Sequence, residues 1–219
     1  MSMQNPENDR LIEDFLELEE QSVLELVQER LTAGDSPLDI IADAQTAMRL
    51  VGERYEEGKY YISSMMMASE IFREIMEILE PLMTLEHEGA TAGRILLCTV
   101  QGDIHDIGKN LLGVLLRLNG FTVTDLGQDT APETVVQEVE KTRPDIVALS
   151  GLITLSYESM KRTIQLIREI EDQTLAQTPV IIGGGTINEM VSTFVGADYW
   201  SIDAIYAVQL CRQILEEKS

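Results

Sequence analysis

The chain has 219 residues, of which 44% are apolar and 25% charged, the composition of an ordinary globular protein. Its formal net charge of −22 disfavours nucleic acid and anionic membranes as partners, because both carry charge of the same sign. No apolar run is long enough to cross a bilayer, and the first ten residues are polar, so we expect a cytoplasmic protein.

The first 88 residues show helical periodicity and no convincing strand, which predicts a four-helix bundle. Its apolar stripes lie in residues 11–18, 23–31, 40–55 and 65–79. Gly34 is expected to end the second helix, and Ser36 followed by Pro37 is typical of a helix start. Ser63 or Ser64 is expected to cap the fourth helix.

Beyond the bundle, strand-like and helix-like runs alternate, which predicts a doubly wound parallel α/β sheet of the Rossmann or flavodoxin type. The expected strands are residues 94–100, 121–126, 145–150, 179–183 and 198–202. The expected helices are 108–118, 132–142, 157–171, 187–195 and 204–217. We therefore expect a helical domain at 1–88, a hinge at 89–93 within the polar stretch 87–93, and an α/β domain at 94–219.

Small polar residues and glycines follow three of the expected strands. They are Gly102, Asp103, His105, Asp106, Ile107 and Gly108 after the first, Ser150, Leu152, Thr154 and Ser156 after the third, and Gly183, Gly184 and Gly185 after the fourth. The carboxyl ends of parallel strands meet at one edge of a sheet, where such folds bind ligands. Glycines and short hydroxyl side chains there indicate a bulky group lying close to the backbone.

His105 admits two interpretations: a hydrogen-bonded histidine at a helix start, or a metal ligand. Asp103, two residues earlier, can hydrogen-bond one ring nitrogen, as in a tuned metal ligand. One imidazole cannot hold a bare transition metal, which needs three or four protein ligands. It can be the sole protein ligand when a macrocycle supplies the others. A metal role for His105 therefore implies a tetrapyrrole-like cofactor.

Other readings of these loops remain open. Ser156 also fits the N-cap of a helix beginning at Tyr157, and the three glycines fit a plain tight turn. The phosphate-loop pattern and the nucleophile elbow are both absent. Cys98 and Cys211 are far apart and predict neither a zinc site nor a disulfide. The acidic clusters fit solvated helix faces or a surface that attracts a basic protein.

The motifs Asp103-x-His105-x-x-Gly108, Ser150-x-Leu152 and Gly183-Gly184 resemble, in order and context, the three signatures of cobalamin-binding domains. The resemblance is to the cobalamin module of cobalamin-dependent methionine synthase, and more closely to the corrinoid proteins of anaerobic methyltransferase systems. It covers residues 10–215, including the helical region, which is similar to the family's cap. The stretch 125–132 departs from the family's pattern.

This resemblance implies roles for the motif residues. His105 would replace the cofactor's own dimethylbenzimidazole as the lower ligand of cobalt. Asp103 would hydrogen-bond His105, and Ser156 would extend that relay. Ser150 and Thr154 would contact the corrin and its nucleotide tail. The other cofactor contacts would be Gly102, Asp106, Ile107, Gly108, Leu152, Gly183, Gly184 and Gly185, with Gly108 and the three glycines lining the slot for the tail.

The resemblance also extends the expected site beyond these loops. Tyr61, Met65 and Met66 would cover the upper corrin face, although a Met-rich helix is equally typical of a plain bundle core. Tyr199 and Trp200 would contact the end of the nucleotide tail.

By resemblance, the chain is a corrinoid methyl carrier. It would bind cobalamin and move a methyl group from a substrate-specific methyltransferase to a second methyltransferase, which passes it to tetrahydrofolate or a thiol. A reductive activase would be a third partner. The chain would be a non-catalytic subunit of this system, since no catalytic barrel lies in its sequence. A cobalamin-dependent sensor or a mutase subunit is the alternative; the sensor lacks a visible DNA-binding module, and the mutase would not need the helical cap.

Overall fold

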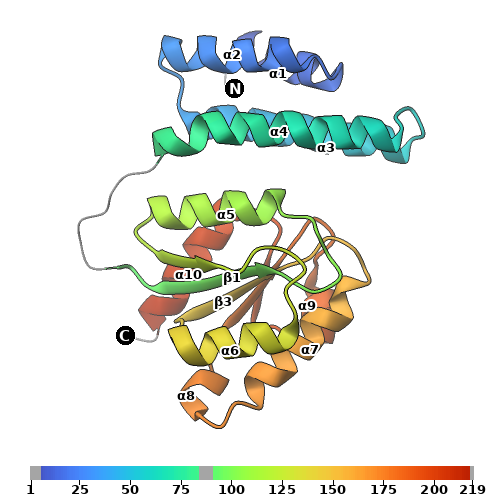
Figure 1. The fold of residues 1–219 in the computed structure, drawn as a ribbon. Helices are drawn as coiled ribbons and strands as arrows, with labels where there is room; N and C mark the ends of the chain where they lie inside the picture. Colours follow the sequence, from blue (N-terminus) through green and yellow to red (C-terminus); the bar gives the residue numbers. More distant parts are fainter. Residues whose placement is uncertain (1–5, 84–90, 218–219) are drawn as a thin grey trace. The chain divides into compact units, whose positions relative to one another are not determined.

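The computed structural model describes residues 6–83 and 91–217, which fall into two compact units, Met1–Thr84 and Leu85–Ser219 (Figure 1). The expected domain boundary at residue 88 lies outside the described residues, and so does most of the expected hinge, of which only 91–93 are described. Within the described ranges, no helix combines the length and the apolar character needed to span a bilayer.

The first unit is helical, as the periodicity predicts. Its helices are α1 (Pro6–Leu16), α2 (Glu20–Ala33), α3 (Pro37–Glu56) and α4 (Ile62–Met83). Each contributes fully buried apolar side chains to the bundle, including Phe15, Val27, Val51 and Ile75. Burial of such side chains stabilises the bundle by about 1.5–3 kcal/mol each.

The ends of these helices agree with the sequence in part. Gly34 takes a φ of 96°, which favours glycine, directly after α2. The Ser36 hydroxyl accepts a hydrogen bond from the Leu38 amide at 3.3 Å, with Pro37 in the first turn of α3. Two expectations were wrong. Leu18 does not continue the stripe of α1 but lies in the turn after it, at a φ of 60°. Neither Ser63 nor Ser64 caps α4, because that helix already begins at Ile62.

A buried cation holds the connection between α2 and α3. The Arg30 side chain is almost completely buried, and its guanidinium donates to Asp35 at 2.7 Å and to Asp43 at 2.8 Å. Both carboxylates remain partly exposed. A buried cation needs such partners, because an uncompensated charge in a core is strongly destabilising.

The second unit is a parallel α/β structure, as predicted. Its strands are β1 (Arg94–Thr99), β2 (Thr122–Asp125), β3 (Ile146–Ser150), β4 (Val180–Gly183) and β5 (Tyr199–Ser201). Its helices are α5 (Ile107–Leu118), α6 (Pro132–Thr142), α7 (Ser156–Arg168), α8 (Gln173–Ala176), α9 (Glu189–Val195) and α10 (Ala204–Glu217). The short helix α8 was not expected from the sequence.

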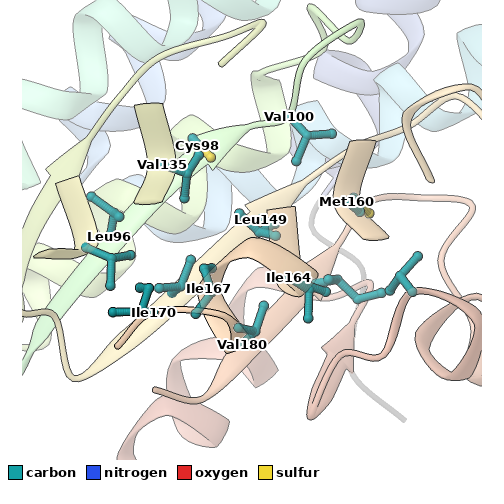
Figure 2. Close-up of a cluster of buried hydrophobic side chains, with 14 of the residues drawn as sticks. Leu96, Cys98, Val100, Val135, Leu149, Met160, Ile164, Ile167, Ile170 and Val180 are labelled. Carbon is teal, nitrogen blue, oxygen red and sulfur yellow. The ribbon is translucent and has the colours of Figure 1, made fainter. Parts of the chain in front are cut away.

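The strands β1, β3 and β4 are mostly buried. Alternate residues of a strand point to opposite sides, so Leu96 and Cys98 of β1, with Val100 just after it, join the apolar cluster under α6 and α7 (Figure 2). On the other side of the sheet, α5 and α10 pack against each other (Figure 1).

The strand order is β2-β1-β3-β4-β5, and all neighbouring strands are parallel. After β1 the chain therefore passes to β2 at one edge of the sheet, whereas after β3 it passes to β4 in the direction of the opposite edge. Ligands of doubly wound sheets bind in the crevice that this reversal opens at the carboxyl ends of the strands. The loops after β1 and β3, where the sequence concentrates its polar motifs, meet at this point.

Candidate functional site

His105 lies in the loop between β1 and α5, two residues before the helix begins. Three hydrogen bonds fix it. Its amide donates to Asp103 Oδ1 at 3.0 Å, and its carbonyl accepts from the buried Thr99 hydroxyl at 3.1 Å. Its ring Nδ1 lies 2.7 Å from the same Asp103 Oδ1. Both the backbone and the ring of His105 are thus held by neighbours at the end of β1.

Asp103 is almost completely buried and connects the two loops at the crevice. Its second oxygen, Oδ2, accepts from the amides of Leu152 at 2.6 Å and Ile153 at 3.1 Å, in the loop after β3. Burial alone would raise the pKa of this carboxyl, but the hydrogen bonds from His105, Ile153 and Leu152 outweigh it and hold the pKa below its ordinary range. Asp103 is therefore an ionised acceptor at neutral pH.

The state of Asp103 determines which nitrogen of His105 is free. An ionised carboxylate only accepts hydrogen bonds, so Nδ1 of the ring must carry the proton that it donates. In the neutral ring, Nε2 then keeps its lone pair. The His105 side chain is 50% exposed. The arrangement presents one imidazole nitrogen at the sheet edge, ready to bind a metal.

The glycines after β3 and β4 are required by the chain's own packing. A Cβ on Gly184 would lie 2.0 Å from the Gly151 carbonyl oxygen, and one on Gly151 would lie 2.5 Å from Ser156 Oγ. A Cβ on Gly183 would lie 3.2 Å from the Ser201 carbonyl oxygen, and one on Gly185 would lie 3.3 Å from Leu152. These contacts are with neighbouring protein segments, and the expected role of the glycines in lining a slot for a bulky ligand stays a prediction.

The expected hydrogen-bond relay from His105 through Asp103 to Ser156 is not formed in this structure. Ser156 is buried at the first position of α7, and its hydroxyl donates to the Ile153 carbonyl at 2.6 Å rather than to Asp103. It is also not the N-cap, which is Leu155. Ser156 thus stabilises the loop that supplies two amides to Asp103, and it does so through the backbone.

The remaining predicted residues of the β1 loop surround His105. Gly102 has a φ of 85°, a conformation that favours glycine. Asp106 is the N-cap residue of α5 and accepts from Gln128 at 2.6 Å. Ile107 and Gly108 open α5, and a Cβ on Gly108 would meet nothing within 4 Å. The surface beside the imidazole is therefore open at Gly108.

The other predicted residues of this unit lie along the same edge of the sheet. Ser150 ends β3 beside Gly183, which ends β4. Thr154 is exposed in the loop after β3. Tyr199 and Trp200 belong to β5, where Trp200 pairs with Ile182 of β4. The expected role of Tyr199 and Trp200 in binding a nucleotide tail stays a prediction.

In the helical unit, Tyr61 directly precedes α4, and Met65 and Met66 lie in its first turns. Tyr61 is 78% exposed and Met66 69%, while Met65 is partly buried. The bundle core is thus not built on Tyr61 or Met66. Exposed large apolar side chains in a cluster are typical of a binding surface.

Sequence reasoning missed two groups of residues. Ile104 and Leu155, in the loops on either side of the crevice, are 70% and 81% exposed. The signal was present, since both are large apolar residues inside polar loops. The second group lies in the β2–α6 loop, residues 126–131, where Gln128 contacts Asp106 and Asp129 contacts the Gly102 amide at 2.7 Å. No local pattern connects that loop to His105.

The metal-binding side chains near His105 suit one kind of metal-containing ligand. Among the described residues, no group of three or more His, Cys, Asp or Glu side chains could hold a bare ion. What the edge of the sheet offers is one oriented imidazole beside an open surface, with exposed Ile104 and Leu155 nearby. This fits a metal whose other ligands belong to an apolar-faced macrocycle.

Comparison with known proteins agrees with this donor set. A family model described as a B12 binding domain matches residues 93–208, and a second model of the same description matches residues 7–80. The chain belongs to the family of cobalamin-binding corrinoid proteins. Its cofactor is cobalamin, and its fold is the Rossmann-like cobalamin-binding fold preceded by a helical cap.

Whole-length relatives support this assignment. The corrinoid protein is 33% identical over 199 residues to trimethylamine corrinoid protein 2 of Methanosarcina acetivorans, with 90% of each chain covered. It is 33% identical over 214 residues to a corrinoid protein of Desulfitobacterium hafniense, covering 94% of this chain and 96% of the relative. The solved structure of the Methanosarcina barkeri monomethylamine corrinoid protein superposes with a TM-score of 0.85 at 28% identity, covering 94% and 96% of the two chains.

Proposed function

We propose that this chain is a corrinoid methyl carrier, which receives a methyl group on bound cobalamin from a substrate-specific methyltransferase and delivers it to a second methyltransferase. The observation that carries the proposal is the Asp103–His105 pair, which presents a half-exposed imidazole with a free Nε2 at the sheet edge. Bound cobalamin would supply a cobalt centre that takes up and releases the methyl group.

The chain's own residues would position and tune that centre. His105 would bind the metal through Nε2. Asp103 would keep the proton on Nδ1 and the ring in one orientation, as outer partners of metal-bound histidines do. Ile104 and Leu155 would contact the apolar face of the macrocycle.

The helical unit would supply the other side of the site. Tyr61, Met65 and Met66 would cover the upper face of the macrocycle and exclude water. A partner must reach the same face to deliver a methyl group, so this cover has to move aside.

The relatives support this role over a sensor or a mutase subunit. Two of the three compared above are named for trimethylamine and monomethylamine. A methanol:cobalamin methyltransferase complex from Methanosarcina barkeri aligns with 98% of this chain and 81% of the solved chain, at 28% identity and a TM-score of 0.54. A methyltransferase is therefore the partner we propose first. A methyl-accepting methyltransferase, a reductive activase and a cytoplasmic location belong to the same proposal.

The test begins with cofactor loading. Apo protein made with 15N-histidine is mixed with hydroxocobalamin, passed through gel filtration and reduced to the cobalt(II) state. We expect the cofactor to co-elute, and we expect the electron paramagnetic resonance spectrum to show coupling to 15N. His105→Ala should abolish that coupling. Absence of co-elution, or equal coupling in His105→Ala, would contradict the proposal.

Methyl transfer is the second stage. The loaded protein and a methyltransferase encoded near it are incubated with methylamines or with methanol, and methylation of the cofactor is followed by visible spectroscopy. We expect one donor class to react, and His105→Ala to reduce the rate. A carrier that accepts no methyl group with any co-encoded methyltransferase would favour the sensor alternative.

A further inference from the structure

The loop between β2 and α6, residues 126–131, lies against the β1 end that leads to His105. Backbone hydrogen bonds join them: the Thr99 amide donates to the Gly127 carbonyl at 2.9 Å, and the Thr130 amide donates to the Thr99 carbonyl at 3.0 Å. The loop therefore continues the pairing of β1 with β2 past the end of the sheet. It reaches the same residue, Thr99, whose hydroxyl holds the His105 carbonyl.

Asp129 makes two contacts across this junction. Its carboxylate Oδ1 accepts from the Gly102 amide at 2.7 Å, and its own amide donates to the Asp103 carbonyl at 3.1 Å. Asp129 thus holds the two-residue segment Gly102–Asp103 at its first amide and at its last carbonyl. That segment carries the carboxylate that orients the His105 ring.

Two backbone conformations make this grip possible. Asp129 has a φ of 50°, in the left-handed region that non-glycine residues rarely adopt, although aspartate tolerates it better than most. Gly102 has a φ of 85°, also left-handed. A non-glycine residue in this region persists where surrounding contacts hold it, and such residues concentrate at functional sites.

The rest of the loop is fastened to the His105 segment as well. Gln128 donates to Asp106 at 2.6 Å, on the far side of His105. Asp129 and Gln128 therefore hold the segment 102–106 at both ends. Of the two, only Asp129 touches the residue that hydrogen-bonds the ring.

We propose that Asp129 is a positioning residue for the metal ligand: it fixes the backbone of the segment Gly102–Asp103 so that the Asp103 carboxylate can orient His105. This inference rests on the proposed function, because it takes His105 to be the cobalt ligand. Asp129 would act through Asp103 and would not contact the cofactor itself.

Three variants separate the carboxylate contact from backbone strain. Asp129→Ala removes the carboxylate and keeps a side chain. Asp129→Gly removes it and relieves the left-handed conformation. Asp129→Asn keeps an oxygen that can accept from Gly102 and a side chain that tolerates the same φ, so it is the matched rescue.

The first measurement uses the apo protein. Amide hydrogen exchange at Gly102 should be about tenfold faster in Asp129→Ala and Asp129→Gly, since each loses one hydrogen bond to a charged acceptor. Asp129→Asn should exchange near the wild-type rate. Far-ultraviolet circular dichroism checks that all three variants fold, and if Asp129→Ala does not, Asp129→Gly carries the test.

The second measurement uses protein labelled with 15N-histidine, loaded with hydroxocobalamin and reduced to cobalt(II). Asp129→Ala and Asp129→Gly should lose at least about half of the 15N-coupled signal, while Asp129→Asn retains it. Wild-type coupling in both the Ala and the Gly variants would overturn the inference, even with faster exchange. Absence of coupling in the wild-type protein would instead overturn the proposed role of His105 and this inference with it.

Discussion

The two units hold their candidate site residues in different ways. In the α/β unit, the Asp103 carboxylate accepts four hydrogen bonds and His105 takes part in three, so protein groups hold both residues in place. In the helical unit, Tyr61 and Met66 project from the start of α4 as largely exposed apolar side chains. The metal ligand is thus preorganised, whereas the proposed cover depends on what it meets. Preorganised ligands suit a centre that must keep one geometry, and exposed apolar surfaces suit contacts that form and break.

The strongest test of this comparison disrupts one unit alone. Arg30→Ala removes the buried cation that pairs with Asp35 and Asp43, and we expect it to destabilise the helical unit by about 3 kcal/mol. Denaturant unfolding followed by circular dichroism measures the loss. Arg10→Ala, which removes an exposed pair with Asp14, is the control and should change stability by less than about 0.5 kcal/mol. Equal effects of the two variants would contradict the account of Arg30.

A second change weakens the preorganised side. Asp103→Asn keeps the shape of the side chain but removes the negative charge of the carboxylate, which accepts hydrogen bonds from His105, Leu152 and Ile153. We expect imidazole coordination to weaken by about 10- to 100-fold, as for other outer partners of metal-bound histidines. Titration of the cofactor's visible spectrum measures this, and the control Asp172→Asn, at the N-cap of α8 and outside the loops around His105, should leave coordination within about threefold.

The thiols report on the α/β unit alone, because both cysteines of the chain, Cys98 and Cys211, lie in it. Burial raises the pKa of each to about 12. Above about pH 9 the unfolded thiols ionise while the folded ones stay neutral, so the unfolded state binds fewer protons and stability falls as pH rises. Each thiol should lower the free energy of unfolding by about 1 kcal/mol between pH 9 and pH 10.

Unfolding free energies at pH 8, 9 and 10 test this expectation. Cys98→Ala should show a shallower decline than the wild type, whatever its stability at pH 8. An unchanged slope would mean that the buried thiol does not contribute. The slope should also be unaffected by Arg30→Ala, if the two units unfold independently.

The smallest expected effect concerns the apolar cover. The double variant Tyr61→Ala, Met66→Ala should change the stability of the apo protein by less than about 0.5 kcal/mol, because both side chains are exposed. In the loaded protein, the same variant should speed reoxidation of the reduced cofactor. Leu38→Ala, an exposed apolar residue of α3, is the control and should leave that rate unchanged.

Features set by local sequence were predicted well. The parallel sheet follows from alternating strand and helix periods, and the contact between Asp103 and His105 follows from their spacing of two residues at a strand end. Gly34 and the pair Ser36-Pro37 mark helix ends for equally local reasons.

Features that depend on neighbouring strands were not predicted. Asp129 reaches Gly102 only because β2 lies beside β1, and a sequence pattern does not reveal that pairing. The Ser156 hydroxyl turns to the Ile153 carbonyl because the loop after β3 brings that oxygen within 2.6 Å. The glycines at the end of β4 were identified, but the close contacts of Gly184 and Gly185 with the loop after β3 become visible only in three dimensions.

The approach of Gly184 to Gly151 has a consequence for how this protein can be redesigned. There is no room for even one methyl group between the loops after β3 and β4. A larger residue in place of Gly184 would therefore displace the loop after β3. The same displacement would pull on the two amides that hold Asp103. Substitution near His105 is therefore easier at the start of α5, where a Cβ on Gly108 would meet nothing within 4 Å.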